Sequence, residues 1–75
     1  MHVIDARGPD GNAFAIMAHA RKIGRQLELE KFWPKGKTDD IIKDMTSGDY
    51  EHLCTTFNKQ FENIAEVEGW ENEHY

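Results

Sequence analysis

The feature that most constrains this fold is a five-residue break at 8–12, followed at once by an amphipathic segment. The break reads Gly-Pro-Asp-Gly-Asn. Its proline fixes one backbone angle, its glycines permit positive φ, and its Asp and Asn side chains accept hydrogen bonds from nearby backbone N–H groups. Such a loop ends one element sharply and starts a helix, with Asp10 or Asn12 as the N-cap. The stretch therefore predicts turn and cap structure, not a reaction.

The predicted first helix extends from about Gly11 to Leu27 and has one apolar face. At 100° per residue, its apolar and small residues fall within an arc of about 120°. These residues are Ala13, Ile16, Met17, Ala20, Ile23, Gly24 and Leu27. A glycine costs about 1 kcal/mol of helix propensity relative to alanine. We therefore expect another element to approach the helix closely at Gly24.

Two more helices are expected in the second half of the chain. Thr38 is the expected N-cap of a short helix that reaches about Met45 and has two aspartates in its first turn. Residues 46–49 break this helix, and Thr46 with Asp49 resembles a capping box. A third helix follows, with apolar residues at helical spacing. Its apolar face comprises Tyr50, Leu53, Cys54, Phe57, Phe61 and Ile64.

Short strands are expected near both ends of the chain. The segment from His2 to Ala6 contains adjacent β-branched residues, and Ile64 to Gly69 alternates apolar with acidic residues. Two isolated strands are marginal alone, so we expect them to pair with each other and pack on the helices. The pattern leaves parallel and antiparallel pairing open. The connection around Trp33 is predicted to be extended because proline follows it, and residues 70–75 are expected to fray.

These expectations describe a single small α+β domain over residues 1–75, in the order β-α-α-α-β. Three helices would pack with a two-stranded sheet formed by the N- and C-terminal strands. A chain of 75 residues buries only about 60–65% of its unfolded surface, so a deep substrate pocket would consume much of its core. This size favours a protein that acts through its surface.

Charge, cysteine content and hydropathy restrict the possible partners and the cellular location of the protein. The net charge of −5 disfavours general nucleic-acid binding. The chain has one cysteine, which excludes an internal disulfide. It has no apolar run of membrane-spanning length and no signal-peptide pattern, so no membrane role and a cytoplasmic location are expected.

We expect no catalytic residue, metal or cofactor, and thus no enzyme. The 8–12 loop matches no phosphate-binding fingerprint, and its aspartate would repel phosphate. His52 and Cys54 point about 200° apart on a helix, and Asp49 with His52 alone makes a poor metal site. Cys54 lies beside an apolar stripe, where cysteines behave as small hydrophobes. The acidic start of the third helix also disfavours a DNA-recognition role.

The basic residues are concentrated in one segment. Six of the nine lysines and arginines lie between positions 21 and 37, and Phe32 and Trp33 lie inside that run. Such interleaving is typical of surfaces that bind acidic proteins or single-stranded nucleic acid. An alternative stays open, in which the two aromatics cap the core and the lysines only solvate the loop. The candidate binding surface comprises Phe14, Arg21, Arg25, Phe32, Trp33, Lys35 and Lys37.

Two motifs carry a resemblance. Residues 8–14, GPDGNAF, together with residues 46–50, TSGDY, and the following Leu53 and Phe57 resemble a family of short uncharacterised bacteriophage and prophage proteins. The resemblance covers most of the chain, except the 32–34 loop and the tail after Gly69. It implies a phage-related origin and the cytoplasm of a bacterial host, and it supplies no catalytic residues.

The predicted function is therefore that of a small phage- or prophage-type accessory protein that binds and modulates a host macromolecule. A protein partner is expected first, and a homodimer is plausible because a thin core leaves apolar surface to bury. The alternative is a small-ligand or single-stranded nucleic-acid binder that uses segment 21–37.

Overall fold

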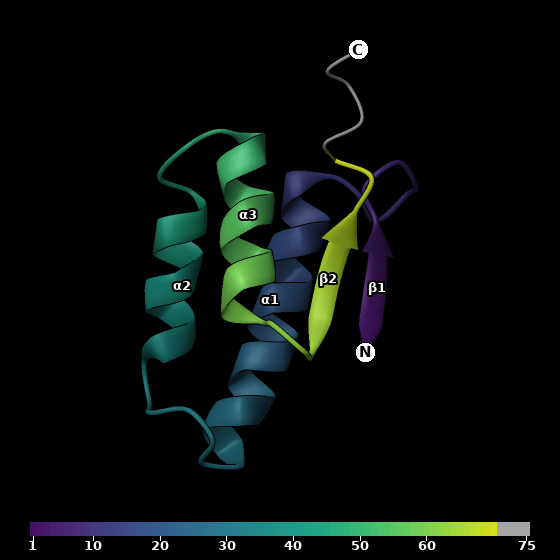
Figure 1. Ribbon diagram of the computed structural model, residues 1–75. Helices are drawn as coiled ribbons and strands as arrows, with labels where there is room; N and C mark the ends of the chain where they lie inside the picture. The colour runs from purple at the N-terminus through teal and green to yellow at the C-terminus, as the bar shows by residue number, and fades with distance from the viewer. Residues whose placement is uncertain (71–75) are drawn as a thin grey trace.

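The computed structural model describes residues 1–70, which form three helices and a two-stranded sheet (Figure 1). The elements in chain order are β1 (His2–Asp5), α1 (Ala13–Leu29), α2 (Lys37–Met45), α3 (Tyr50–Gln60) and β2 (Ala65–Glu68). The predicted α+β fold and β-α-α-α-β order are confirmed. Of the tail predicted to fray, residues 71–75 lie outside the described part of the chain.

The two strands are parallel, a point that the sequence leaves open. Their register pairs His2 with Ala65 and Ile4 with Val67. Parallel neighbours need a long crossover connection, which the three helices supply here. In Figure 1 the strands lie side by side in front of α1, with β1 at the margin of the molecule. The sheet therefore has one face toward the helices and one face toward solvent.

The core lies between the inner face of the sheet and the helices. α2 packs along both α1 and α3, whereas α1 and α3 contact each other less extensively. The short second helix thus packs against both of the other helices. The buried hydrophobic residues are Ile4, Ile16, Ala20, Ile41, Met45, Leu53, Cys54, Phe57, Phe61, Ala65 and Val67.

Gly24 marks the close approach of α2 to α1, as the sequence predicts. A Cβ atom at this position would lie 2.5 Å from Oγ1 and 2.6 Å from Cγ2 of Thr38. Such distances are far below van der Waals contact, so a larger residue fits only if the Thr38 side chain or α2 shifts. The side chain of Thr38 is fully buried against this glycine.

The prediction that Thr38 caps α2 is wrong. The N-cap is Gly36, in the left-handed region at φ 93°, and Thr38 lies inside the first turn. The helix start is capped from a distance by Glu28 of α1. Its carboxylate accepts hydrogen bonds from the N–H groups of Thr38, at 2.9 Å, and Gly36, at 3.3 Å. Because Glu28 supplies the cap, the Thr38 side chain can pack against Gly24.

The other two helices begin with local caps. Asn12, one of the two predicted candidates, caps α1 by accepting from the Ala15 N–H at 2.8 Å. Asp49 caps α3 by accepting from the His52 N–H at 2.9 Å. The predicted capping box is not formed, since Thr46 instead ends α2 as its C-cap.

Several predicted boundaries shift at the chain's later turns. α3 ends at Gln60, so Ile64 lies outside its apolar face and is 38% exposed. Trp70 packs, partly buried, against the core, which corrects the prediction that fraying begins there. None of the helices in residues 1–70 combines the length and hydrophobicity needed to span a bilayer.

Candidate functional site

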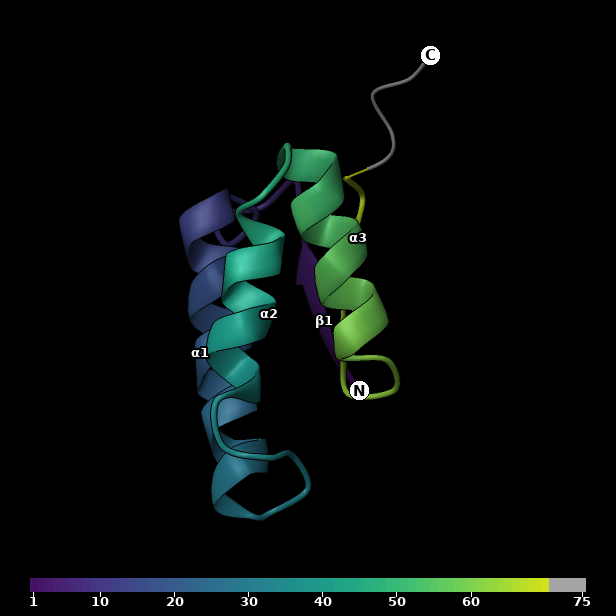
Figure 2. The ribbon, with the colours of Figure 1, turned by 90° about the vertical axis from the view of Figure 1, so that its left-hand side faces the viewer.

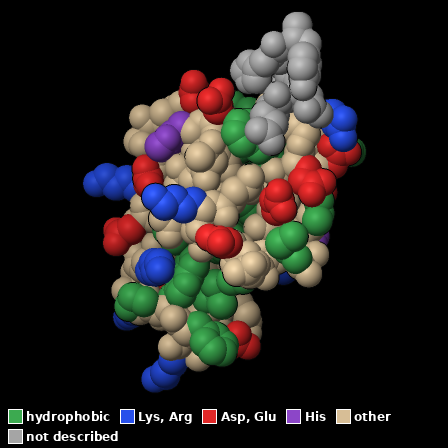
Figure 3. All heavy atoms as spheres, viewed as in Figure 1, with side chains coloured by type: hydrophobic (Ala, Val, Ile, Leu, Met, Phe, Trp, Pro, Cys, Tyr) green, Lys and Arg blue, Asp and Glu red, His purple; other side chains and the backbone are tan. Residues whose placement is uncertain are grey.

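A groove of about 800 Å³ lies where the end of α1 meets the α1–α2 connection. This end projects beyond α3 and the sheet (Figures 1 and 2). Hydrophobic and basic side chains gather there in Figure 3. The residues that line this groove, called the loop groove below, are Arg25, Glu28, Leu29, Lys31, Phe32, Trp33, Pro34 and Lys35.

The groove arises from a tight reversal at the end of α1. Lys31 has a left-handed backbone with φ 65°. The N–H groups of Phe32 and Trp33 both donate to the carbonyl of Leu27, at 3.0 and 3.2 Å. The segment around Trp33 therefore bends and is not extended as predicted. The reversal leaves Leu29 76% exposed and Phe32 74% exposed beside the groove.

Trp33 belongs to the core and to the groove at once. It is partly buried against the core, and its ring centroid lies 5.2 Å from that of Phe61. The Lys37 Nζ atom lies 4.6 Å from the Trp33 ring centroid, a cation–π distance. Trp33 therefore packs on the core, as the core-cap interpretation predicts, and it also lines the groove.

The charges around the loop groove are mainly positive. The Glu28 carboxylate accepts hydrogen bonds as the cap of α2. The hydroxyl of Thr38 and the N–H groups of Thr38 and Gly36 lower the pKa of this carboxyl. That hydroxyl lies beside the carboxylate without making a hydrogen bond of regular geometry. Arg25 pairs with Asp39 at 2.8 Å. Within residues 1–70, Lys31 and Lys35 form no ion pair.

The structure brings together only part of the predicted binding surface. Arg25, Phe32, Trp33 and Lys35 line the loop groove, and Lys37 covers Trp33. Phe14 is 81% exposed but lies in the first turn of α1, at the opposite end of that helix.

Sequence reasoning also misplaces Arg21 and misses several groove residues. Arg21 precedes Arg25 by one turn and does not line the groove. The predicted surface also lacks four residues that line the groove, which are Glu28, Leu29, Lys31 and Pro34. The apolar Leu29, two residues after the predicted helix end at Leu27, is the sequence feature that indicates a longer helix, because two more helical residues bring Leu29 to the groove that Phe32 also lines.

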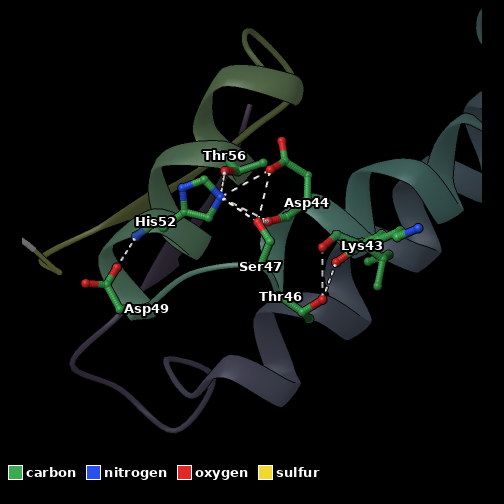
Figure 4. A network of polar contacts seen from close by, with 8 residues as sticks. Lys43, Asp44, Thr46, Ser47, Asp49, His52 and Thr56 are labelled. Carbon is green, nitrogen blue, oxygen red and sulfur yellow. Dashed lines mark hydrogen bonds and ion pairs between the residues drawn. The ribbon is translucent and has the colours of Figure 1, made fainter.

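A polar cluster around His52 joins the end of α2 to α3 (Figure 4). The His52 Nε2 atom lies 3.0 Å from the Asp44 carbonyl and 3.2 Å from its carboxylate. The same nitrogen lies 3.3 Å from the Ser47 hydroxyl and 3.4 Å from that of Thr56. Sequence reasoning paired His52 with Asp49 instead, but Asp49 binds only the backbone N–H of that histidine.

The geometry of this cluster does not suit a nucleophilic relay. A Ser–His–Asp relay uses one ring nitrogen for the hydroxyl and the other for the carboxylate. Here Asp44 and Ser47 share one nitrogen, and the Ser47 hydroxyl donates to the Asp44 carbonyl at 2.6 Å. The cluster therefore fixes the turn between α2 and α3.

Cys54 and the acidic residues are not grouped into a metal-binding cluster in the described part of the chain. Cys54 is fully buried. Burial raises the pKa of its thiol, although a contact with Tyr50 partly offsets that rise. Across residues 1–70, no three metal-ligating side chains come together.

No protein-family model, curated protein or solved structure matches this chain. The two motifs that carry the phage-family resemblance do meet in space, since the hydroxyl of Tyr50 donates to the carbonyl of Gly11. A Cβ atom at Gly11 would lie 2.0 Å from the Ala6 carbonyl oxygen. Both motifs thus hold the fold together, and the family resemblance stays a prediction.

Proposed function

We propose that this protein binds a segment of another protein in the loop groove, as a small phage- or prophage-type accessory protein that modulates a host protein in the bacterial cytoplasm. The observation that carries the proposal is the pair Leu29 and Phe32, which are 76% and 74% exposed beside an 800 Å³ groove. Large apolar side chains grouped at the surface are typical of binding sites. Aromatic residues are favoured anchors of such interfaces.

The charge around the groove favours an acidic partner. Lys31 and Lys35 have no carboxylate partner among residues 1–70, and the Glu28 carboxylate is engaged by backbone N–H groups. A local positive charge on a chain of net charge −5 attracts and orients an acidic segment. The partner that fits best presents a large apolar side chain flanked by aspartate or glutamate.

The alternative nucleic-acid function has less support from this geometry. Single-stranded nucleic acid binds by stacking its bases on exposed aromatic faces. Trp33 packs on Phe61 and lies beneath Lys37, so Phe32 is the freer platform. A small ligand would fit the volume, which lies within the range of about 300–1,000 Å³ for such sites. A protein segment fits better where the apolar lining is so exposed.

Capture from a bacterial host lysate, followed by cross-linking, tests the proposal. A photo-reactive residue at position 35 should cross-link a captured protein, and the variant Leu29→Ser with Phe32→Ser should lose that product. Phe14→Ser is the matched control, because it removes an equally exposed apolar side chain at the other end of α1. Equal capture by wild type and the groove variant would exclude the groove, and loss of the product after nuclease treatment would favour the nucleic-acid function.

A further inference from the structure

The outer edge of β1 is a second surface, separate from the loop groove. The His2 N–H donates to the Ile64 carbonyl at 3.0 Å, and the Ala6 N–H donates to the Glu68 carbonyl at 2.8 Å. Backbone groups of alternate residues in a strand point to opposite sides. The backbone groups of Val3 and Asp5 therefore point away from β2.

The other edge of the sheet is already closed. The Asn58 side chain accepts from the Val67 N–H at 2.7 Å and donates to the Val67 carbonyl at 3.1 Å. The Ala65 N–H donates to the Phe61 carbonyl at 3.0 Å. A carboxamide from α3 thus takes the place of a neighbouring strand along β2.

The edge of β1 has no such cover within residues 1–70. The Asp5 carbonyl accepts from the Gly8 N–H at 3.0 Å. The N–H and carbonyl of Val3 and the N–H of Asp5 have no backbone partner in that part of the chain. In Figure 1, β1 lies at the margin of the sheet, and no described helix or strand lies along its outer side, although the loop that follows β1 extends past its upper end. Exposed edges of this kind accept added strands.

The solvent face of the sheet beside this edge is acidic. Register places Val3 opposite Glu66 and Asp5 opposite Glu68, and acidic side chains lie over the strands in Figure 3. Like charges directly opposite each other are unfavourable in a sheet. Among residues 1–70, Arg7 forms an ion pair only with Asp5, at 3.3 Å. A strand that carried cations along this face would reduce the repulsion.

We propose that the β1 edge binds an extended basic segment of a partner protein as a third strand. Lysine or arginine at alternate positions would lie on the solvent face near Asp5, Glu66 and Glu68. The intervening residues would lie toward α1, on the side where the His2 and His19 rings are 5.3 Å apart. Backbone pairing supplies the affinity and the acidic face supplies the selectivity.

A second copy of this chain fits the edge less well. Pairing β1 with its own copy would join two acidic faces into one. A four-residue strand also buries far less than the roughly 1,600 Å² typical of a stable specific interface. A basic partner segment pairs with the same short strand but brings opposite charge to the acidic face, so charge favours it over a second copy and weak, peptide-type binding is expected.

Two synthetic peptides of eight residues provide the probes, one alternating lysine and valine and one alternating glutamate and valine. Titrated into isotope-labelled protein, the lysine peptide should shift the Val3 and Asp5 amide resonances and slow their hydrogen exchange. The glutamate peptide should do neither. Val3→Pro removes the outward N–H and leaves the bonds of His2, Ile4 and Ala6 to β2 in place.

The expected result is at least about tenfold weaker binding of the lysine peptide by Val3→Pro. Val3→Thr, which keeps the N–H, should bind like wild type. If Val3→Pro fails to fold, the variant Glu66→Gln with Glu68→Gln leaves the backbone edge intact and should weaken binding at low salt.

Four results of the peptide titrations would overturn the proposal. They are equal binding of the glutamate peptide, equal binding by Val3→Pro and Val3→Thr, shifts confined to Phe32 and Lys35, and no binding up to millimolar peptide. A concentration-dependent dimer that Val3→Pro abolishes would assign the edge to a second copy instead, and would also overturn it.

Discussion

At Gly24, two effects of a single methyl group oppose each other. Alanine gains about 1 kcal/mol of helix propensity over glycine. Its Cβ would lie 2.5–2.6 Å from two side-chain atoms of Thr38, and overpacking of this kind costs about 1–3 kcal/mol. We expect the steric effect to dominate, so Gly24→Ala should lower the free energy of unfolding in urea titrations.

A double variant separates the two effects at this contact. Thr38→Ala removes the Oγ1 and Cγ2 atoms that a Cβ at Gly24 would meet most closely. In that background, Gly24→Ala should be neutral or stabilising. If Gly24→Ala raises the stability of the otherwise unchanged protein, α2 does not pack closely on α1 there.

The Glu28 carboxylate links stability to pH. Hydrogen bonds from Thr38 and Gly36 lower the pKa of this carboxyl in the folded state. The ionised carboxylate therefore adds to the free energy of unfolding at pH values above the unfolded pKa, and this stabilisation is lost as pH falls through the folded pKa. Glu28→Gln should lower the urea midpoint at about pH 7, since an amide offers these N–H donors one acceptor oxygen. The difference in urea midpoint between Glu28→Gln and wild type should become smaller by about pH 3. An equal difference at both pH values would contradict the capping role.

Residue-level prediction succeeds where the partner is local. Asn12 and Asp49 cap the helices that follow them, within three residues of the N–H group that they accept from. Thr38 fits the same local rule, yet the cap of α2 comes from Glu28, ten residues before it. A local rule cannot identify a distant competitor, and that competitor also helps to form the groove.

At the scale of elements, Asn58 connects α3 to the sheet. Its two hydrogen bonds satisfy the N–H and carbonyl of Val67, so Asn58→Ala leaves two backbone groups without partners. We expect a loss of about 1–3 kcal/mol in the free energy of unfolding. The Val67 amide should also exchange faster with solvent, whereas the Glu66 amide, which faces β1, should change less.

Lys59→Ala provides the control for Asn58→Ala on the same helix. Lys59 is exposed, and its removal should change neither stability nor Val67 exchange appreciably. Unchanged exchange of the Val67 amide in Asn58→Ala would show that the carboxamide does not close this edge.

The sequence predicts which elements form better than how they face one another. Alternation in residues 65–68 identifies β2, but the same alternation suits a parallel or an antiparallel partner. The loop groove depends on two added residues at the end of α1 and on the left-handed backbone of Lys31. Neither of these two features produces a periodic pattern in the sequence. The sequence therefore indicates Phe32, Trp33 and Lys35 as candidate binding residues, but not Leu29 or Lys31.

At the scale of the whole molecule, the two proposed surfaces have opposite charge. The loop groove is lined by Arg25, Lys31 and Lys35, and the solvent face of the sheet carries Asp5, Glu66 and Glu68. The loop groove is thus predicted to select acidic partners and the sheet edge basic ones. Separate elements carry the two sites, so a variant at one should leave binding at the other unchanged.

Cys54 reports on the stability of the entire core. It is fully buried, and burial raises the pKa of its thiol, so the reactive thiolate forms mainly when the chain opens. A single core of this size supplies about 3–5 kcal/mol, which predicts labelling by a thiol reagent about 100- to 10,000-fold slower than in the unfolded chain. The rate should rise with urea along the slope of global unfolding. Labelling of the folded protein as fast as the unfolded chain would mean that Cys54 is accessible, and its role as a nucleophile would then need to be reconsidered.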